Sequence, residues 1–328
     1  MRALRIQDTD SGPRASFMDM TVADLSAGDV VIKSRYSCVN YKDALAVTGK
    51  GKIARTRPLN AGIDVAGTVE SSTSDRFAPG DEVIVTGWFM SETRDGGYAD
   101  YVRIPADCIV AKPAGLSLWE TMAIGTAGFT AGMAIRRMIE NHQQSGQGPV
   151  LVTGATGGVG SYAIDMLAAA GFDPIAVTRR GEQHGQFLRS LGAVDVIAPE
   201  ALDLGGKPLA RTEYAGAIDS VGGELLANIM GRIHPYGNVA AVGLAGGMKL
   251  ATTVAPFILR GVSLLGIHSV ECPHAWREQI WAQMASAHKP AHLDSIATQT
   301  VCLSDVHAVC EAMVAGEHVG RTVVDLQQ

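Results

Sequence analysis

Short apolar runs separated by turn residues dominate the first third of the chain. They lie at residues 30–33, 62–70, 82–85 and 98–104. Runs of this length between glycine, proline and aspartate clusters are typical of β-strands. From residue 116 the apolar spacing becomes helical, first at 118–123 and then at 127–140. The pattern therefore predicts a β-rich beginning and a change of architecture near residue 120.

Strand-like and helix-like segments then alternate along the chain. Strands are predicted at 150–153, 174–178, 195–197, 216–220, 237–242 and 262–268, with helices ending near 170 and at 185–191 and 225–229. Strands joined by crossover helices form a parallel, doubly wound sheet. The last thirty residues return to strand, helix and strand, closing at 322–326. We therefore predict an α/β protein in which residues 123–268 form a doubly wound domain inserted into a β-rich domain made of 1–122 and 269–328.

One glycine-rich turn carries the clearest chemical signal. Residues 150–164 (VLVTGATGGVGSYAI) give an apolar strand, a turn and the start of a helix, with glycines at 154, 157 and 160. This spacing suits a tight turn, a close approach of backbone to a pyrophosphate, and packing of helix on strand. The helix amides and dipole favour the phosphate charge. We interpret the turn as a dinucleotide site, the alternative being a tight turn with a structural role only.

The end of the next strand indicates which dinucleotide binds. An acidic residue about 20 positions beyond the glycine turn selects NAD, but Thr178, Arg179 and Arg180 stand there instead. A guanidinium group fits a 2′-phosphate as a planar, bidentate donor. We predict NADPH as the cofactor; the alternative is that both arginines are solvated surface charges.

Composition narrows the possible partners. The chain has 328 residues, 47% of them hydrophobic and 18% charged, and a formal net charge of −6, which argues against nucleic-acid binding by overall field. The five cysteines show no paired metal-ligand spacing, as expected in a reducing cytosol. We expect no secretory signal at the N-terminus and no membrane span, because no apolar run approaches the ~20 residues that one needs. The prediction is a cytoplasmic protein without nucleic-acid or membrane partners.

Four further segments resemble the medium-chain dehydrogenase/reductase superfamily. They are residues 62–69 (GIDVAGTV), 79–83 (PGDEV), 96–101 (GGYADY) and 124–131 (IGTAGFTA). Within that superfamily, residues 40–52 (NYKDALAVTGKGK) resemble the quinone-oxidoreductase-like group and its acrylyl-CoA reductase branch. The resemblance implies a GroES-like catalytic domain interrupted by a Rossmann domain that binds NADPH.

The chain departs from the zinc alcohol dehydrogenases at the metal-ligand positions. Cys38 is followed by no nearby histidine, residues 62–64 read Gly-Ile-Asp rather than glycine, histidine, glutamate, and only Cys108 lies near the place of the four-cysteine lobe. A catalytic zinc needs three protein ligands and an open position, so we predict no metal. Reduction of a C=C bond conjugated to a thioester needs no Lewis acid, because hydride adds to the β carbon and a proton to the α carbon.

We therefore predict reduction of acrylyl-CoA to propanoyl-CoA. The alternatives are reduction of a quinone or another enone, and an NADPH-binding regulatory or structural protein without turnover.

The resemblance also implies site residues. Tyr41 is expected in the cofactor cleft, where its hydroxyl could bind the cofactor, orient substrate or lie on a proton path; a packing tyrosine is the alternative. The other expected cofactor contacts are Gly154, Thr156, Gly157, Gly158, Val159, Gly160, Thr178, Arg179, Arg180, Leu244, Ile258, Ser269 and Arg321. The rule that ligands bind at the carboxyl ends of parallel strands independently supports Leu244 and Ser269. Arg321 could equally form a surface ion pair.

Two surfaces are candidates for binding the coenzyme A part of the substrate and a second subunit. Lys50, Lys52, Arg55 and Arg57 place four positive charges within eight residues and could bind the phosphates of coenzyme A; a solvated loop is the alternative. The apolar strand at 262–267 is expected at a sheet edge, where its unpaired backbone would favour a homodimer.

Overall fold

The computed structural model describes residues 1–10 and 12–328. They form two compact units: one contains Met1–Thr126, Ser269–Ser286 and Leu293–Gln328, and the other Ala127–His268 and Ala287–His292. The division predicted from sequence placed the boundaries after residues 122 and 268, without the short segment 287–292.

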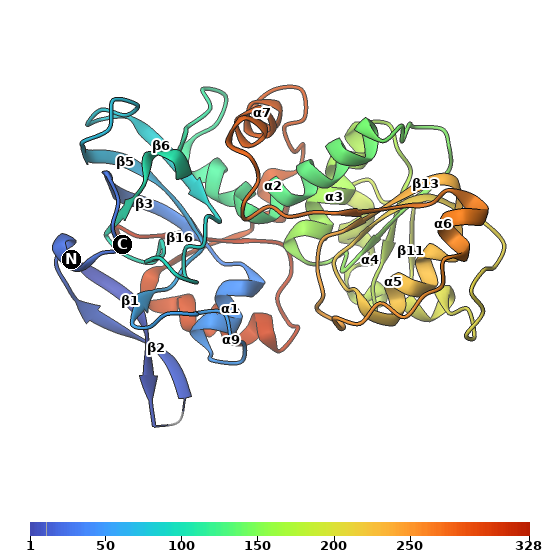
Figure 1. The fold of residues 1–328 in the computed structure, drawn as a ribbon, viewed down its shortest axis with the longest axis horizontal. Helices are drawn as coiled ribbons and strands as arrows, with labels where there is room; N and C mark the ends of the chain where they lie inside the picture. The colour runs from blue at the N-terminus through green and yellow to red at the C-terminus, as the bar shows by residue number, and fades with distance from the viewer. Residues whose placement is uncertain (11) are drawn as a thin grey trace. The chain divides into compact units, whose positions relative to one another are not determined.

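The first unit is built on two sheets (Figure 1). One has the order β2-β1-β4, with β1 at Arg2–Thr9, β2 at Gly12–Asp19 and β4 at Leu59–Asn60. The other is seven-stranded, with the order β15-β16-β3-β5-β6-β8 and β7 paired to β3. Its strands are β3 (Val30–Cys38), β5 (Asp64–Ser72), β6 (Glu82–Thr86), β7 (Tyr101–Ile104), β8 (Val110–Ala111), β15 (Gln299–Cys302) and β16 (Thr322–Asp325).

Helices α1 (Tyr41–Val47) and α9 (Val306–Val314) pack together in this unit, although they lie far apart in sequence. Ala44 and Val47 of α1 and Cys310 of α9 share one buried apolar cluster, which also contains Tyr98. Helix α7 (His274–Met284) and the single turn α8 (Leu293–Ile296) also belong to this unit. The C-terminal strand and helix are thus part of the β-rich unit.

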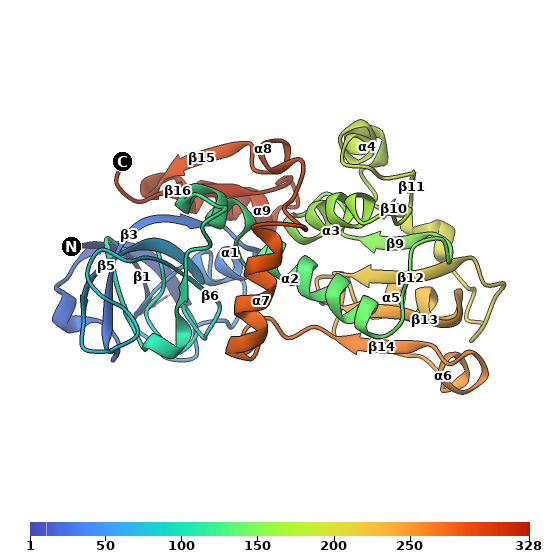
Figure 2. The ribbon, with the colours of Figure 1, turned by 90° about the horizontal axis from the view of Figure 1, so that it is seen from above.

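The second unit is the parallel sheet that the sequence predicts. Its six strands, all parallel, follow the order β11-β10-β9-β12-β13-β14, and Figure 2 shows them stacked in that order. They are β9 (Val150–Thr153), β10 (Pro174–Val177), β11 (Asp195–Ile197), β12 (Tyr214–Asp219), β13 (Ile233–Ala241) and β14 (Ser263–Gly266). The helices are α3 (Gly158–Ala169), α4 (Gly181–Ser190), α5 (Gly223–Met230) and α6 (Ala255–Arg260). The predicted α/β fold class is confirmed.

Helices α1, α6, α7 and α8 were not predicted, and α2 differs from its predicted form. The segments 118–123 and 127–140 are one helix, α2 (Leu118–Glu140), with a break at Gly125 (φ 50°, ψ −161°) that only glycine adopts readily. Helix α6 was not predicted, because its six residues are too few to show a period; Pro256 near its start and left-handed Gly261 at its end define it.

Candidate functional site

The glycine turn joins β9 to α3. Gly154 is left-handed (φ 60°), and the amide of Gly157 donates to the carbonyl of Gly154 at 2.9 Å, which closes the turn. A Cβ on Gly160 would lie 2.4 Å from that carbonyl oxygen, so only glycine allows the first turn of α3 to approach the strand this closely. No side chain of the described residues caps the amides that open α3. This end of the helix therefore fits a pyrophosphate.

The carboxyl end of β10 places a positive charge beside the turn. The Arg180 guanidinium donates to the Thr156 hydroxyl at 2.8 Å, and the Arg180 amide donates to the Thr178 hydroxyl at 3.1 Å. Thr156 and Thr178 are buried, whereas Arg179 is exposed. The structure thus brings Arg180, Thr178 and the glycine turn together, with a cation where an NAD-selecting acid would stand.

Asp219, at the carboxyl end of β12, is a buried residue of this edge that the sequence analysis missed. Its carboxylate accepts hydrogen bonds from the Thr153 hydroxyl at 2.6 Å and from the Gly222 amide at 2.7 Å. Burial is the main cause that raises its pKa. Asp219 therefore ties the ends of β9 and β12 together. The only signal for it in the sequence was an aspartate at the end of an apolar strand.

The two apolar residues expected near the nicotinamide lie at opposite ends of the sheet. Leu244 follows β13 and is exposed, in a loop whose Gly246 amide donates to Val221 at 2.8 Å, so it belongs to the carboxyl edge. Ile258 lies on α6, which leads into the amino end of β14, and it is 73% exposed. The structure does not bring Ile258 together with the other expected cofactor residues of this unit.

In the first unit, Tyr41 opens α1 and its side chain is 46% exposed. Asn40 caps this helix: its backbone amide and its side-chain amide both donate to the Asp43 carboxylate, at 2.9 and 3.0 Å. The Ile63 amide donates to the other oxygen of Asp43 at 2.8 Å. Burial first, and the charge of Asp64 second, raise the pKa of Asp43 to about 7. Asp43 therefore fixes the position from which Tyr41 projects.

A second buried carboxylate, Asp64, accepts hydrogen bonds from four groups. They are the Cys38 thiol at 3.1 Å, the Asn40 side-chain amide at 3.0 Å, the Thr126 amide at 2.8 Å and the Thr126 hydroxyl at 2.5 Å. A Cβ on Gly125 would lie within 3.0 Å of this carboxylate, of the Cys38 sulfur and of the Arg321 guanidinium. The break in α2 is therefore what allows these groups to pack.

Arg321 is buried and is not a surface ion pair. Its guanidinium donates to the carbonyls of Val39 at 2.8 Å and Ala123 at 3.2 Å, and to the Asn40 side-chain oxygen at 3.0 Å. It thereby links the segment before β16 to residues 39 and 40, which lead into α1 and Tyr41.

Three residues of the basic loop have acidic partners. Lys50 pairs with Glu311 at 2.8 Å, Arg57 with Asp8 at 2.7 Å and Arg55 with Glu92 at 3.3 Å. Glu92 also pairs with Lys42 at 2.8 Å. Lys52 is exposed.

Ser269 is held by a buried arginine that sequence reasoning missed. Its carbonyl accepts from the Arg277 guanidinium at 2.7 Å, and Arg277 also donates to the Val270 carbonyl at 3.1 Å and to the Thr86 carbonyl and hydroxyl at 2.7 Å. Burial lowers the pKa of Arg277 to about 10. No local pattern around residue 277 indicated this role.

Comparison with known proteins agrees with this geometry. The alcohol dehydrogenase GroES-like domain family matches residues 26–114, and the zinc-binding dehydrogenase family matches residues 158–286. Acrylyl-CoA reductase AcuI of Ruegeria pomeroyi is 42% identical over 322 residues, which cover 98% of this chain and 97% of the relative. The chain belongs to the medium-chain dehydrogenase/reductase superfamily.

Two other superfamily members are similarly close. The quinone-oxidoreductase-like protein YhfP of Bacillus subtilis is 44% identical over 94% of this chain and 93% of its own. A crystal structure of YhfP with NAD bound has a TM-score of 0.94, at 42% identity over 99% of each chain. The YhdH oxidoreductase of Salmonella enterica, crystallised with NADP, has a TM-score of 0.96 at 42% identity, covering 99% of this chain and 100% of that one. The predicted resemblance is confirmed.

The zinc site of some medium-chain dehydrogenase/reductase members is not matched by the donors present here. Cys38 donates a hydrogen bond to Asp64, and the Asp64 carboxylate accepts further hydrogen bonds that occupy its oxygens. Ile63 supplies no ligand. Within residues 1–10 and 12–328, no three histidine, cysteine, aspartate or glutamate side chains gather as a possible metal site. These residues do not fit a catalytic zinc, which needs three protein ligands.

As for membranes, no helix in the described part of this medium-chain dehydrogenase/reductase chain is both long and apolar enough to cross a bilayer.

Proposed function

We propose that this chain is an NADPH-dependent reductase of the C=C bond of an α,β-unsaturated acyl thioester, with acrylyl-CoA reduced to propanoyl-CoA. The cofactor assignment rests on the hydrogen bond from the Arg180 guanidinium to the Thr156 hydroxyl, which holds this cation beside the glycine turn. The substrate assignment is supported by 42% identity to an acrylyl-CoA reductase over nearly the whole chain.

Bound NADPH would supply the hydride for the β carbon, and a proton would complete the α carbon. The α3 amides and the glycine turn are assigned to the pyrophosphate, and Thr178, Arg179 and Arg180 to the 2′-phosphate. Tyr41 is assigned to orienting the substrate or carrying its proton, because its phenol is the exposed polar group at the start of α1. Leu244, Ser269 and Arg321 are kept as nicotinamide-side candidates.

The basic loop is proposed to bind the phosphates of coenzyme A. The partners of Lys50 and Arg57, Glu311 and Asp8, are themselves exposed, so these ion pairs are screened by solvent and can exchange for a phosphate. Lys52 adds a further exposed cation.

A quinone or another enone is the second candidate substrate. It is favoured by the similarity to YhfP and by the acids that already pair with the basic loop. A third possibility is an NADPH-binding protein without turnover.

Steady-state kinetics with acrylyl-CoA, crotonyl-CoA and a benzoquinone, each with NADPH and NADH, distinguish these functions. We expect the highest kcat/KM for acrylyl-CoA with NADPH. Neutralising Lys50, Lys52, Arg55 and Arg57 should raise KM for the thioester and leave a small quinone unaffected. Turnover of the quinone alone would favour the second candidate, and turnover of no enone would favour the third.

The cofactor assignment has its own test. Replacing Arg179 and Arg180 with alanine should weaken the binding of NADPH and leave the binding of NADH nearly unchanged, because only NADPH carries the 2′-phosphate. An unchanged ratio of the two kcat/KM values would refute the assignment.

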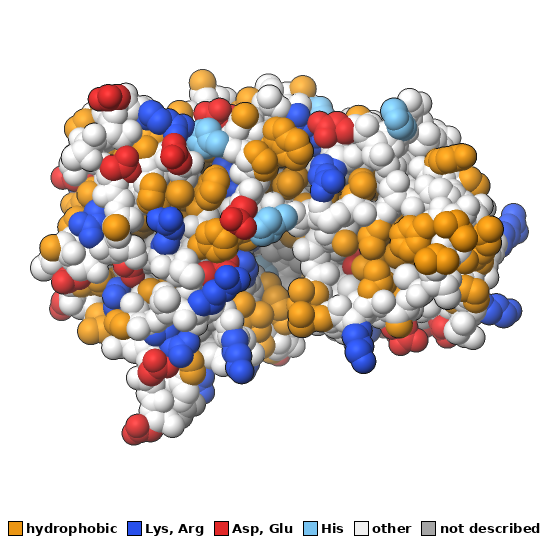
Figure 3. All heavy atoms as spheres, in the orientation of Figure 1, with side chains coloured by type: hydrophobic (Ala, Val, Ile, Leu, Met, Phe, Trp, Pro, Cys, Tyr) orange, Lys and Arg blue, Asp and Glu red, His pale blue; other side chains and the backbone are white. Residues whose placement is uncertain are grey.

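We also propose a homodimer through the edge strand β14. Several large apolar side chains of β13, of α6 and of the segment before α6 are exposed: Tyr236, Met248, Val254, Ile258 and Leu259. Figure 3 shows apolar side chains concentrated over the part of the surface where Figure 1 places α6. Patches of this kind mark interaction surfaces, and Ile258 would belong to this one. Sedimentation of a monomer only, at micromolar concentration, would remove the dimer.

The proposed location is the cytoplasm. None of the five cysteines, all of which lie within the described residues, forms a disulfide, as expected in a reducing compartment.

A further inference from the structure

The loop between β6 and β7 is held in an unusual conformation. Trp88, Phe89 and Ser91 all have positive φ (49°, 62° and 62°), a region that non-glycine residues rarely adopt. Such conformations persist only where the surroundings over-determine them. Glu92 follows directly, so its position is fixed by an unusually constrained backbone.

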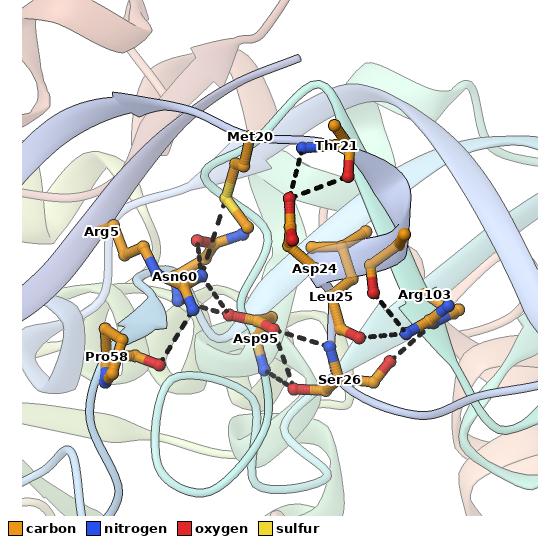
Figure 4. A network of polar contacts seen from close by, with 11 residues as sticks. Arg5, Met20, Thr21, Asp24, Leu25, Ser26, Pro58, Asn60, Asp95 and Arg103 are labelled. Atoms are coloured by element: carbon orange, nitrogen blue, oxygen red, sulfur yellow. Dashed lines mark hydrogen bonds and ion pairs between the residues drawn. The ribbon is translucent and has the colours of Figure 1, made fainter.

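Asp95 anchors the same loop. Its carboxylate accepts hydrogen bonds from the Arg5 guanidinium at 2.9 Å and the Asn60 amide at 2.8 Å, and from the amide and hydroxyl of Ser26 at 2.7 and 2.9 Å (Figure 4). The Asp95 amide donates back to the Ser26 hydroxyl at 2.9 Å. Three separate segments therefore hold the loop that carries Glu92.

Glu92 is a nearly buried anion between two cations. Its side chain is 8% exposed, and its carboxylate lies 2.8 Å from Lys42 Nζ and 3.3 Å from Arg55 Nη2. Its carbonyl oxygen also accepts from the Arg55 amide at 2.8 Å. The two cations keep contact with water, since their side chains are 31% and 63% exposed.

The other two acids that pair with the basic loop are much more exposed than Glu92. Asp8 and Glu311 are 67% and 46% exposed, so they can swing into solvent when a phosphate takes their place. Glu92 cannot, because its backbone and side chain are both fixed. It remains a permanent counter-charge.

We infer that Glu92 is a specificity-determining residue that limits how strongly Lys42 and Arg55 attract the phosphates of an acyl-CoA substrate. The inference rests on the proposed function, since it concerns the same thioester site. A fixed anion weakens the binding of substrate and product alike, and it acts only on ligands that carry phosphates. It therefore sets the balance between thioesters of coenzyme A and uncharged enones.

The test is calorimetric binding of free coenzyme A to the full chain at low ionic strength. Glu92→Gln should lower the dissociation constant about fivefold, the effect of one unit charge near the ligand in a solvated setting. The gain should fade as salt is raised. Glu92→Asp, which keeps the charge, should stay close to wild type. Asp107→Asn, an equal charge change at an exposed acid paired with Arg76, is the matched control and should have no effect.

An unchanged or larger dissociation constant for Glu92→Gln, or an equal gain for Asp107→Asn, would overturn the inference. Should Glu92→Gln not fold, as its melting temperature would show, Arg55→Met should instead weaken binding about fivefold, and no change would overturn it. Turnover separates the two proposals: acrylyl-CoA reduced with an unaltered KM in Glu92→Gln removes only the role of Glu92. Failure of the wild type to reduce acrylyl-CoA removes the proposed function.

Discussion

The buried carboxyl of Asp43 should make the stability of the protein depend on pH in an unusual direction. Its pKa of about 7 compares with 3.8 for an ordinary aspartate, chiefly because burial disfavours the charge. Between those two values the folded protein holds a proton on Asp43 that the unfolded chain has lost. The free energy of unfolding from this group is therefore fully present below pH 3.8 and falls as pH rises through 7.

The size of the effect follows from the two pKa values. Each pH unit corresponds to about 1.4 kcal/mol, so the contribution of Asp43 declines by roughly 4 kcal/mol between pH 4 and pH 7. This is a large part of the stability of a typical protein, about 5–15 kcal/mol. Asp43→Asn abolishes the titration, although an amide cannot accept from all three donors that face Asp43.

The assay is urea unfolding of wild type and Asp43→Asn at several pH values from 4 to 8. The difference between the two free energies isolates Asp43 from the other titrating groups, and wild type should lose its advantage as pH rises. Asp24→Asn is the control. Asp24 occupies the same capping position at a surface turn, where hydrogen bonds from the amide and hydroxyl of Thr21 lower its pKa. Its contribution should stay constant from pH 4 to pH 8, because a lowered pKa causes loss of stability only on acidification below pH 3.8. A difference for Asp43→Asn that is constant or grows with pH would refute the reasoning.

Three further substitutions test packing, two in the second unit and one in the first. Gly160→Ala should destabilise by roughly 1–3 kcal/mol and abolish NADPH binding, because its Cβ meets the Gly154 carbonyl. Gly185→Ala is the control: nothing lies within 4 Å of its Cβ, so it should instead stabilise α4 by roughly 0.5–1 kcal/mol. Thermal melts and a fluorescence titration with NADPH compare the two variants. Equal melting temperatures would contradict the packing account. Arg277→Met should lower the free energy of unfolding, measured by chemical denaturation, by at least roughly 2 kcal/mol, because it leaves buried carbonyls without a donor. A change below about 0.5 kcal/mol would count against that role.

The sheet and the glycine turn were predictable because their signals are local. The strand, the turn and the helix start lie within residues 150–164, and each glycine acts on neighbours a few positions away. The kinked helix α2 was visible for the same reason, as two helical patterns on either side of Gly125. Helix α6 was missed because six residues give no readable period.

The polar partners of the site were not predictable, because the fold brings them from far along the chain. Arg277 reaches Thr86 across 191 positions, and Asp64 reaches Thr126 across 62. Neither pair leaves a pattern in a window of ordinary length. Arg321 shows the consequence, since an arginine before the last strand can be a surface charge or a buried donor, and only the carbonyls around it decide.

The basic loop shows why a run of like charges is weak evidence for a binding site. Counted along the sequence, residues 50–57 carry four positive charges and no negative one. In the folded protein, three acidic side chains form ion pairs with these cations: Asp8, Glu92 and Glu311. What distinguishes these acids is burial: the exposed pairs can open for a phosphate at little cost, whereas Glu92 stays. We therefore expect the affinity of the loop for an anion to depend on Glu92 as well as on its own four cations.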